Sequence, residues 1–79
     1  MKYVVSFVSE YGEVETTGIF KTEVEAIRKM NQYANERLTK ARKHGVEYHI
    51  EPSDNPCKIK IFNHGFWFVN SLVNANDFD

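Results

Sequence analysis

The sequence contains a single cysteine, Cys57, among its 79 residues. A lone thiol cannot close a disulfide within the chain, and small secreted domains usually carry several cysteines. The sequence therefore predicts a protein of a reducing, cytoplasmic environment. The start of the chain, MKYVVSFVSE, has one basic residue and an apolar run broken by Ser6 and Glu10, so we expect a first β-strand there and no signal peptide.

Long apolar runs and glycine-rich motifs are also missing. No stretch approaches the ~20 apolar residues of a membrane-spanning helix, so we expect no membrane partner. The four glycines are scattered, and none builds a phosphate-binding loop. The three histidines and Cys57 lack zinc-ligand spacing, so the sequence predicts neither a metal nor another cofactor.

No catalytic motif stands out either, and we expect a protein that is not an enzyme. The alternation around Cys57 groups this thiol with Ile59 and Ile61, which favours a buried, inert side chain over a nucleophile. An enzyme would need His49 or His64 to lie in a cleft beside a partner group.

Charge is distributed unevenly, although the net charge is only −1. Residues 1–25 contain two Lys and five Glu, residues 26–46 contain six Lys or Arg and one Glu, and residues 47–79 contain two Lys and five acidic residues. With 11 acidic and 10 basic residues, the whole chain lacks the basic balance typical of nucleic-acid-binding domains.

The basic segment between Thr22 and Gly45 has the features of an amphipathic helix. Thr22 followed by Glu25 is a capping box, and Gly45 suits the left-handed residue that ends a helix. Apolar side chains recur at helical spacing along one predicted core-facing stripe. The stripe consists of Val24, Ile27, Met30, Ala34, Leu38 and Ala41.

Alternating or turn-bounded patterns predict strands at residues 2–9, 13–20, 46–51, 57–62 and 66–71, and Gly18 within the second indicates a bulge. The order ββαβββ predicts one α+β domain over residues 1–72, with the helix packed on one face of an antiparallel sheet of four to five strands. The acidic segment 73–79 is expected to be a loosely ordered tail. We expect function on the sheet face away from the helix, called the open face.

The stretch FNHGFWF, residues 62–68, decides which aromatic rings lie on the open face. Consecutive Phe66, Trp67 and Phe68 cannot all point to one side of a strand. A two-residue loop at His64-Gly65 places aromatic and aliphatic side chains on the open face beside two lysines. The predicted partner-binding residues in this register are Phe62, Trp67, Val69, Lys58 and Lys60.

A three-residue loop at residues 63–65, with a glycine bulge, is the alternative register. It moves Trp67 and Val69 into the core and turns Phe66 and Phe68 outward, because a one-residue shift exchanges the two faces of a strand. Phe62 belongs to the outward set in both registers.

We therefore expect a small protein-binding module, an inhibitor or accessory factor of phage or mobile-element type, whose partner is another protein or a second copy of itself. The alternative is nucleic-acid binding through the basic helix. A cationic stripe there could follow a phosphate backbone, with a tyrosine stacking on a base. The stripe consists of Lys29, Tyr33, Arg37, Lys40 and Lys43.

Overall fold

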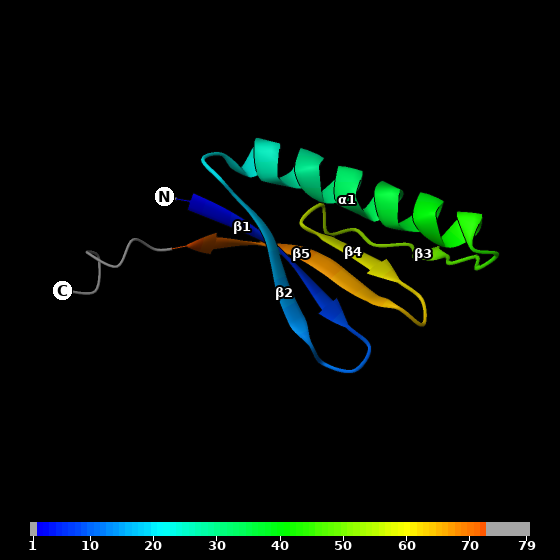
Figure 1. Cartoon of the computed structure of the whole chain (residues 1–79). Helices are drawn as coiled ribbons and strands as arrows, with labels where there is room; N and C mark the ends of the chain where they lie inside the picture. The colour runs from blue at the N-terminus through cyan, green and yellow to red at the C-terminus, as the bar shows by residue number, and fades with distance from the viewer. Residues whose placement is uncertain (1, 73–79) are drawn as a thin grey trace.

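Within residues 2–72, five antiparallel strands and one helix build an α+β domain, as the sequence predicts (Figure 1). The structure is a computed structural model that describes residues 2–72, and the predicted tail 73–79 lies outside the described residues. The elements are β1 (Lys2–Ser9), β2 (Val14–Phe20), α1 (Glu23–Lys43), β3 (Ile50–Glu51), β4 (Lys58–Ile61) and β5 (Gly65–Leu72). The strand order across the sheet is β2-β1-β5-β4-β3, so β1 and β5 lie beside each other inside the sheet.

Helix α1 begins and ends as its sequence predicts. The Thr22 Oγ1 accepts a hydrogen bond from the backbone N–H of Glu25 at 3.2 Å, which satisfies one of the free donors of the first turn. At the other end Gly45 adopts a φ of 77°, and the N–H of Val46 donates to the carbonyl of Ala41 at 2.9 Å. Together with the bond from Gly45 to Arg42, this is a Schellman cap.

The third strand is shorter than its alternating pattern predicts. Residues 46–51 alternate, but only Ile50 and Glu51 pair with β4. Val46 is still bound to the helix cap, so the chain must first travel from the helix layer to the edge of the sheet. The predicted strand over 46–51 was therefore too long by its first four residues.

The core lies between α1 and one face of the sheet. The helical stripe that enters it differs from the predicted one, because Val24 is 78% exposed whereas Ala26 is completely buried. Small side chains on the helix leave room for the large rings that stand up from β1 and β5. The buried cluster consists of Val5, Phe7, Ala26, Met30, Ala34, Ile61 and Trp67.

A β-bulge in β2 changes which of its side chains face outward. Val5 pairs with Gly18 and Ser6 pairs with Thr16, so Thr17 is the extra residue. The Thr17 hydroxyl donates to the carbonyl of Val5 at 3.0 Å and fixes the bulge. This irregularity lies next to Gly18, as the sequence indicates.

The β4–β5 hairpin has three unpaired residues, Phe62, Asn63 and His64, because Ile61 pairs with Gly65. Asn63 adopts a left-handed φ of 59°, which asparagine tolerates better than most residues. Gly65 has a φ of 154° and lies so close to β1 that a Cβ there would overlap the carbonyl oxygen of Val8. These two residues supply the turn that a three-residue connection requires.

The predicted two-residue register was wrong, and with it the placement of Trp67 and Val69 on the open face. Trp67 is 2% exposed, and its ring lies 4.8 Å from that of Phe7 and 5.8 Å from that of Tyr33, centroid to centroid. Val69 packs against the same cluster. The side chains of β5 are therefore distributed as in the three-residue alternative, with Phe66 and Phe68 directed away from α1.

Trp67→Ala tests this register. We expect it to lower the free energy of unfolding by about 3–5 kcal/mol, because it leaves a large cavity beneath α1. Urea denaturation measures the loss. Phe62→Ala in the same hairpin is the control: this ring is 54% exposed, and its removal should cost less than about 1 kcal/mol. Equal losses for the two variants would contradict the burial of Trp67.

Gly65→Ala tests the close approach of the hairpin to β1. The added Cβ meets the carbonyl oxygen of Val8, so we expect a loss of more than about 2 kcal/mol in unfolding free energy. Gly12→Ala is the matched control, because Gly12 also has a positive φ of 85° but has no atom within 4 Å of the new Cβ. The Gly12→Ala variant should lose only about 1 kcal/mol of unfolding free energy, which is the cost of backbone strain alone.

Candidate functional site

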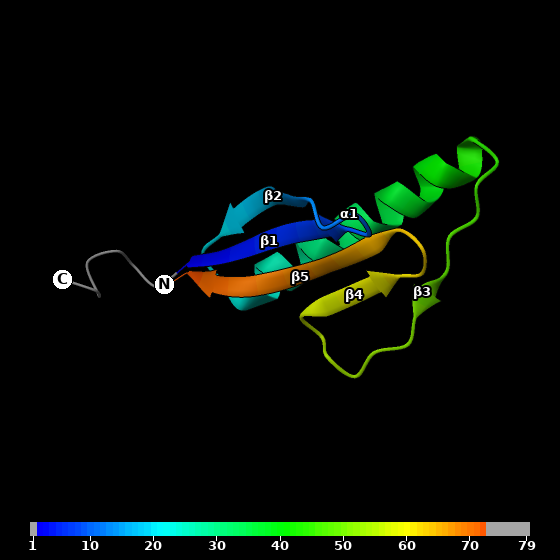
Figure 2. The same ribbon diagram turned by 90° about the horizontal axis from the view of Figure 1, so that it is seen from below.

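The open face of the sheet is the candidate site, because within residues 2–72 no helix or strand covers it (Figure 2). In Figure 2 the sheet lies in front of α1, which packs on its far side. Strand pairing and side-chain alternation arrange the residues of this face in rows that cross the strands. The rows are Val14, Val8, Phe66 and Lys60; then Thr16, Ser6, Phe68 and Lys58; and then Ile19, Val4 and Asn70.

Phe66 and Phe68 stand at the centre of the open face. Their ring centroids are 5.7 Å apart, and both rings are half-buried. Each ring has a lysine directly opposite on β4, Lys60 beside Phe66 and Lys58 beside Phe68. The Nζ of Lys58 lies 4.6 Å from the centroid of the Phe66 ring, a cation–π contact. The Nζ of Lys60 lies 3.4 Å from a carboxylate oxygen of Glu51.

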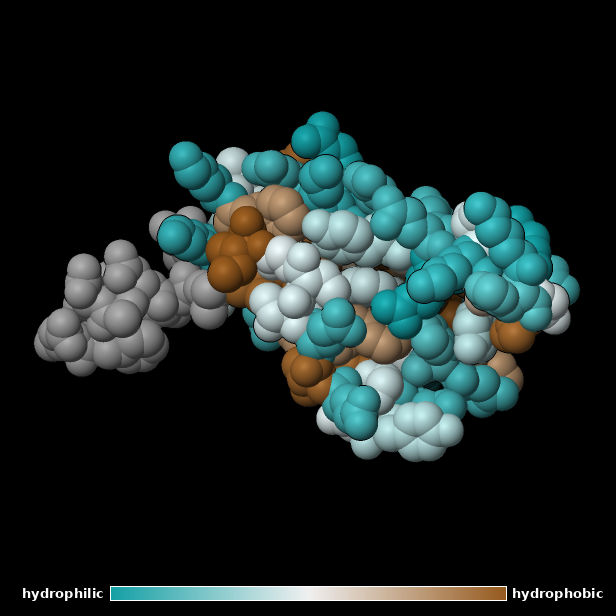
Figure 3. Space-filling view, viewed as in Figure 1, coloured by the Kyte–Doolittle hydropathy of each residue, from teal (hydrophilic) through white to brown (hydrophobic). Residues whose placement is uncertain are grey.

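Exposed apolar side chains border this centre. Val14 and Ile19 of β2 are 66% and 56% exposed, and Phe62 in the hairpin turn lines a shallow depression with Lys60 and Phe66. In the view of Figure 3, hydrophobic spots lie along the region of β2 and are separated by polar side chains. The bulge at Thr17 turns Ile19 to the open face. Gly18, which lies between these two residues, is the signal in the sequence that could have indicated this orientation.

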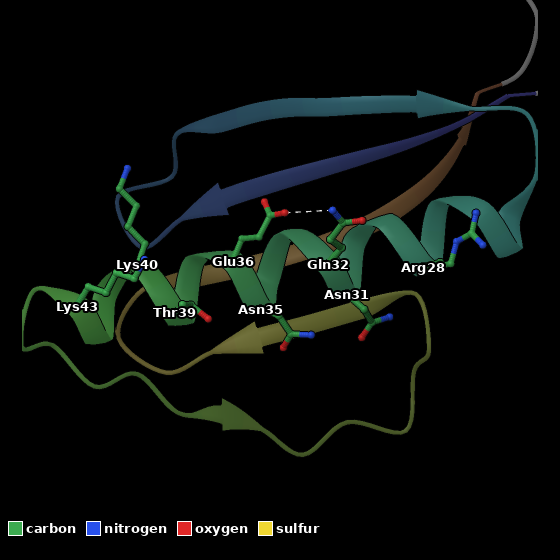
Figure 4. A pocket seen from close by; sticks show the side chains of 8 residues that line it. All are labelled: Arg28, Asn31, Gln32, Asn35, Glu36, Thr39, Lys40 and Lys43. Atoms are coloured by element: carbon green, nitrogen blue, oxygen red, sulfur yellow. Dashed lines mark hydrogen bonds between the residues drawn. The ribbon is translucent and has the colours of Figure 1, made fainter.

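The outer surface of α1 carries a shallow depression between long polar side chains (Figure 4). Gln32 donates to the Glu36 carboxylate at 3.1 Å, and Asn31 donates to the backbone of Ile27 at 2.8 Å, so these groups already bond along the helix. A ligand here would touch exposed side chains of a single helix, and we interpret the surface as a solvated one. Its lining residues are Arg28, Asn31, Gln32, Asn35, Glu36, Thr39, Lys40 and Lys43.

The predicted nucleic-acid stripe is divided between two sides of α1, so its assignment to one continuous surface was wrong. Lys40 and Lys43 lie on the outer surface (Figure 4). Tyr33 and Arg37 instead point toward the sheet, where both contact the ring of Trp67. Helix periodicity allowed either side for these two residues, and the aromatic core determined it. The remaining member of the stripe, Lys29, is half-buried.

Arg37 connects α1 to the end of the sheet that carries the β4–β5 turn. Its guanidinium carbon lies 4.9 Å from the centroid of the Phe7 ring, and its Nη1 lies 3.1 Å from Nε2 of His64. The imidazole also stacks on Tyr48, with 4.5 Å between ring centroids. Because a guanidinium can only donate, Nε2 of His64 accepts this hydrogen bond, which requires a neutral imidazole.

The surroundings of His64 favour the same protonation state. Burial lowers the pKa of His64, and the Arg37 charge lowers it further, whereas Glu10 acts in the opposite direction. His64 lies in a recess together with Arg37, and in this respect it meets the requirement stated above for a catalytic histidine. The Nε2 atom of His64 is, however, already engaged by the guanidinium of Arg37. We interpret the Arg37–His64 pair as a structural link between α1 and the hairpin turn.

Cys57 is half-buried, and its Sγ lies 3.8 Å from a carboxylate oxygen of Glu23. Burial raises the pKa of the Cys57 thiol, and the Glu23 charge raises it further, so the thiolate that a nucleophile requires is disfavoured. Among the described residues, no group of His, Cys, Asp and Glu side chains is arranged to hold a metal ion. No described helix has the length and apolar character needed to cross a membrane.

Comparisons with protein-family models, with curated protein sequences and with solved structures found no match for this chain. No relative therefore supplies a function, a substrate or a set of site residues.

We expect His64 to make the stability of the protein depend on pH, because its pKa is lowered in the folded state. Between its lowered folded-state pKa and the ordinary value of 6.5, the unfolded chain binds more protons than the folded one. The contribution of His64 to stability should therefore be fully present above pH 6.5 and should be lost as the pH decreases toward the folded-state pKa. Chemical unfolding at about pH 7 and about pH 5, on either side of the ordinary histidine pKa of about 6.5, measures the loss.

His64→Gln is the control for this pH dependence, because glutamine does not titrate but still offers an oxygen to Arg37. The variant should lose less stability than the wild-type protein over the same pH interval. If both proteins lose the same amount, His64 does not contribute to the dependence.

Proposed function

We propose that the protein is a non-enzymatic binding module that contacts another protein through its open face, as an inhibitor or accessory factor of phage or mobile-element type. The observation that carries this proposal is the pair of rings, Phe66 and Phe68, on a strand inside the sheet. Clustered apolar side chains on a solvent-facing surface are typical of interaction sites. Protein interfaces commonly have aromatic residues in the core and polar residues at the rim.

The rings are not needed to complete the hydrophobic core. The buried cluster beneath α1 is built without Phe66 and Phe68, and the other face of β5 already contributes Trp67 to it. A β-sheet whose second face only meets water usually alternates toward polar side chains there. Two consecutive outward positions of β5 carry phenylalanine instead, which favours a function in contact with a partner.

The open face is also preorganised for binding. Strand β5 pairs with β1 on one side and with β4 on the other, so the backbone that carries the two rings is fixed before a partner arrives. Val4 and Ser6 of β1, which point to the same face, are buried among their neighbours. A rigid surface loses little conformational entropy on association, which strengthens binding at a given contact area.

Affinity capture from the native host tests the proposed surface. The double variant Phe66→Thr with Phe68→Thr removes both rings while keeping residues that suit an exposed strand. We expect it to lose a protein that the wild-type chain retains. Thermal unfolding of the variant verifies that it is still folded.

Val24→Thr is the matched control for this experiment. Val24 is an exposed apolar residue on α1, which lies on the other side of the molecule from the open face. This variant should retain the partner. Equal retention by the folded double variant would contradict the proposed surface, and so would loss of the partner from the Val24 variant.

A further inference from the structure

We infer that the open face fits a partner protein whose contact surface is apolar at its centre and acidic where it meets Lys58 and Lys60 of β4. The inference rests on the proposed function and specifies the chemistry of the partner. It is carried by Lys58 and Lys60, which lie beside Phe68 and Phe66 on the neighbouring strand β4.

The open face is basic although the chain as a whole is acidic. Lys58 and Lys60 lie on it, and alternation along β1 places Lys2 on the same side as Val4. The acidic residues near them are Glu51, opposite Lys60, and Glu10, which lines the depression beside Lys60 and Phe66. The net charge of the chain is −1, so the residues outside the open face together carry a charge more negative than −1. Positive potential is therefore concentrated where the outward rings are, and complementary charge favours the correct partner.

Lys58 makes an acidic partner necessary as well as favourable. Its ammonium group lies over the Phe66 ring, so a partner that covers this ring also removes Lys58 from water. Among the described residues the one ion pair joins Lys60 to Glu51, and Lys58 has no carboxylate partner. Burying an ammonium without a counter-charge is costly, and a carboxylate on the partner removes this cost.

Two other occupants fit the surface less well. A second copy bound through the same face would bring lysines against lysines, because a twofold interface joins identical patches. A single-stranded nucleic acid would satisfy the lysines with phosphates, but its bases need free ring faces. Lys58 already occupies one face of Phe66, and Glu51 lies beside Lys60.

Selection of short random peptides displayed on phage tests the inference. The wild-type protein is the bait, and the folded Phe66→Thr, Phe68→Thr double variant is used for counter-selection. We expect the enriched peptides to combine Asp or Glu with aromatic or aliphatic residues and to carry a net negative charge. Synthetic copies of the enriched peptides are then measured by fluorescence anisotropy.

Charge reversal supplies a matched pair of variants for the anisotropy measurement. Lys58→Glu should weaken peptide binding by at least about tenfold, because it replaces attraction by repulsion at the centre of the contact. Lys40→Glu makes the same change in net charge on the outer surface of α1. It should alter binding by less than about twofold, because exposed charges at a distance are screened by salt.

Each other outcome overturns the inference. Enrichment of neutral or basic peptides, or equal effects of the two charge reversals, contradicts an acidic partner but leaves a protein-binding open face intact. Failure to enrich any peptide also contradicts the inference. The proposed function is tested separately, by the affinity capture from the native host. Salt-sensitive binding of an oligo-dT strand that Lys58→Glu abolishes would assign the face to nucleic acid. A dimer in sedimentation that the double variant abolishes would assign it to a second copy.

Discussion

The packing of Trp67 beneath α1 determines the orientation of β5 and, through it, the character of both faces of the sheet. The indole lies between Phe7 of β1 and Tyr33 of the helix. Because neighbouring residues of a strand point to opposite sides, Phe66 and Phe68 must then face away from the core. The outward direction of these two rings, on the surface that we associate with binding, is therefore a direct consequence of core formation.

Arg37 extends this packing toward the end of the sheet. Its guanidinium lies over the rings of Phe7 and Trp67 and contacts His64 in the hairpin turn. One charged side chain thereby links the helix, two strands and the turn, although it was predicted to be part of a solvent-facing stripe. A long side chain whose stem and planar head pack on aromatic rings contributes contact area as well as charge.

The features that depend on local sequence could be predicted, and those that depend on tertiary packing could not. Thr22 and Gly45 define the ends of α1 by hydrogen bonds within a few residues of themselves. The register of the last hairpin depends instead on whether Trp67 or its neighbours fill the space under the helix, and the sequence allows both. For the same reason Phe66 and Phe68 appeared only in the alternative register, and Val24 was placed in the core that Ala26 enters.

The position of the first and last strands has a consequence for how the chain acquires its structure. Residues as distant in sequence as Lys2 and Leu72 are direct neighbours in the sheet, and β1 also pairs with β2. The early hairpin and the helix can form while the chain is still being synthesised, but both long strands inside the sheet remain incomplete until β5 has left the ribosome. Contacts of such long sequence separation slow folding. Until that moment the edge of β1 is unpaired, and it is the segment on which misassembly with other chains would begin.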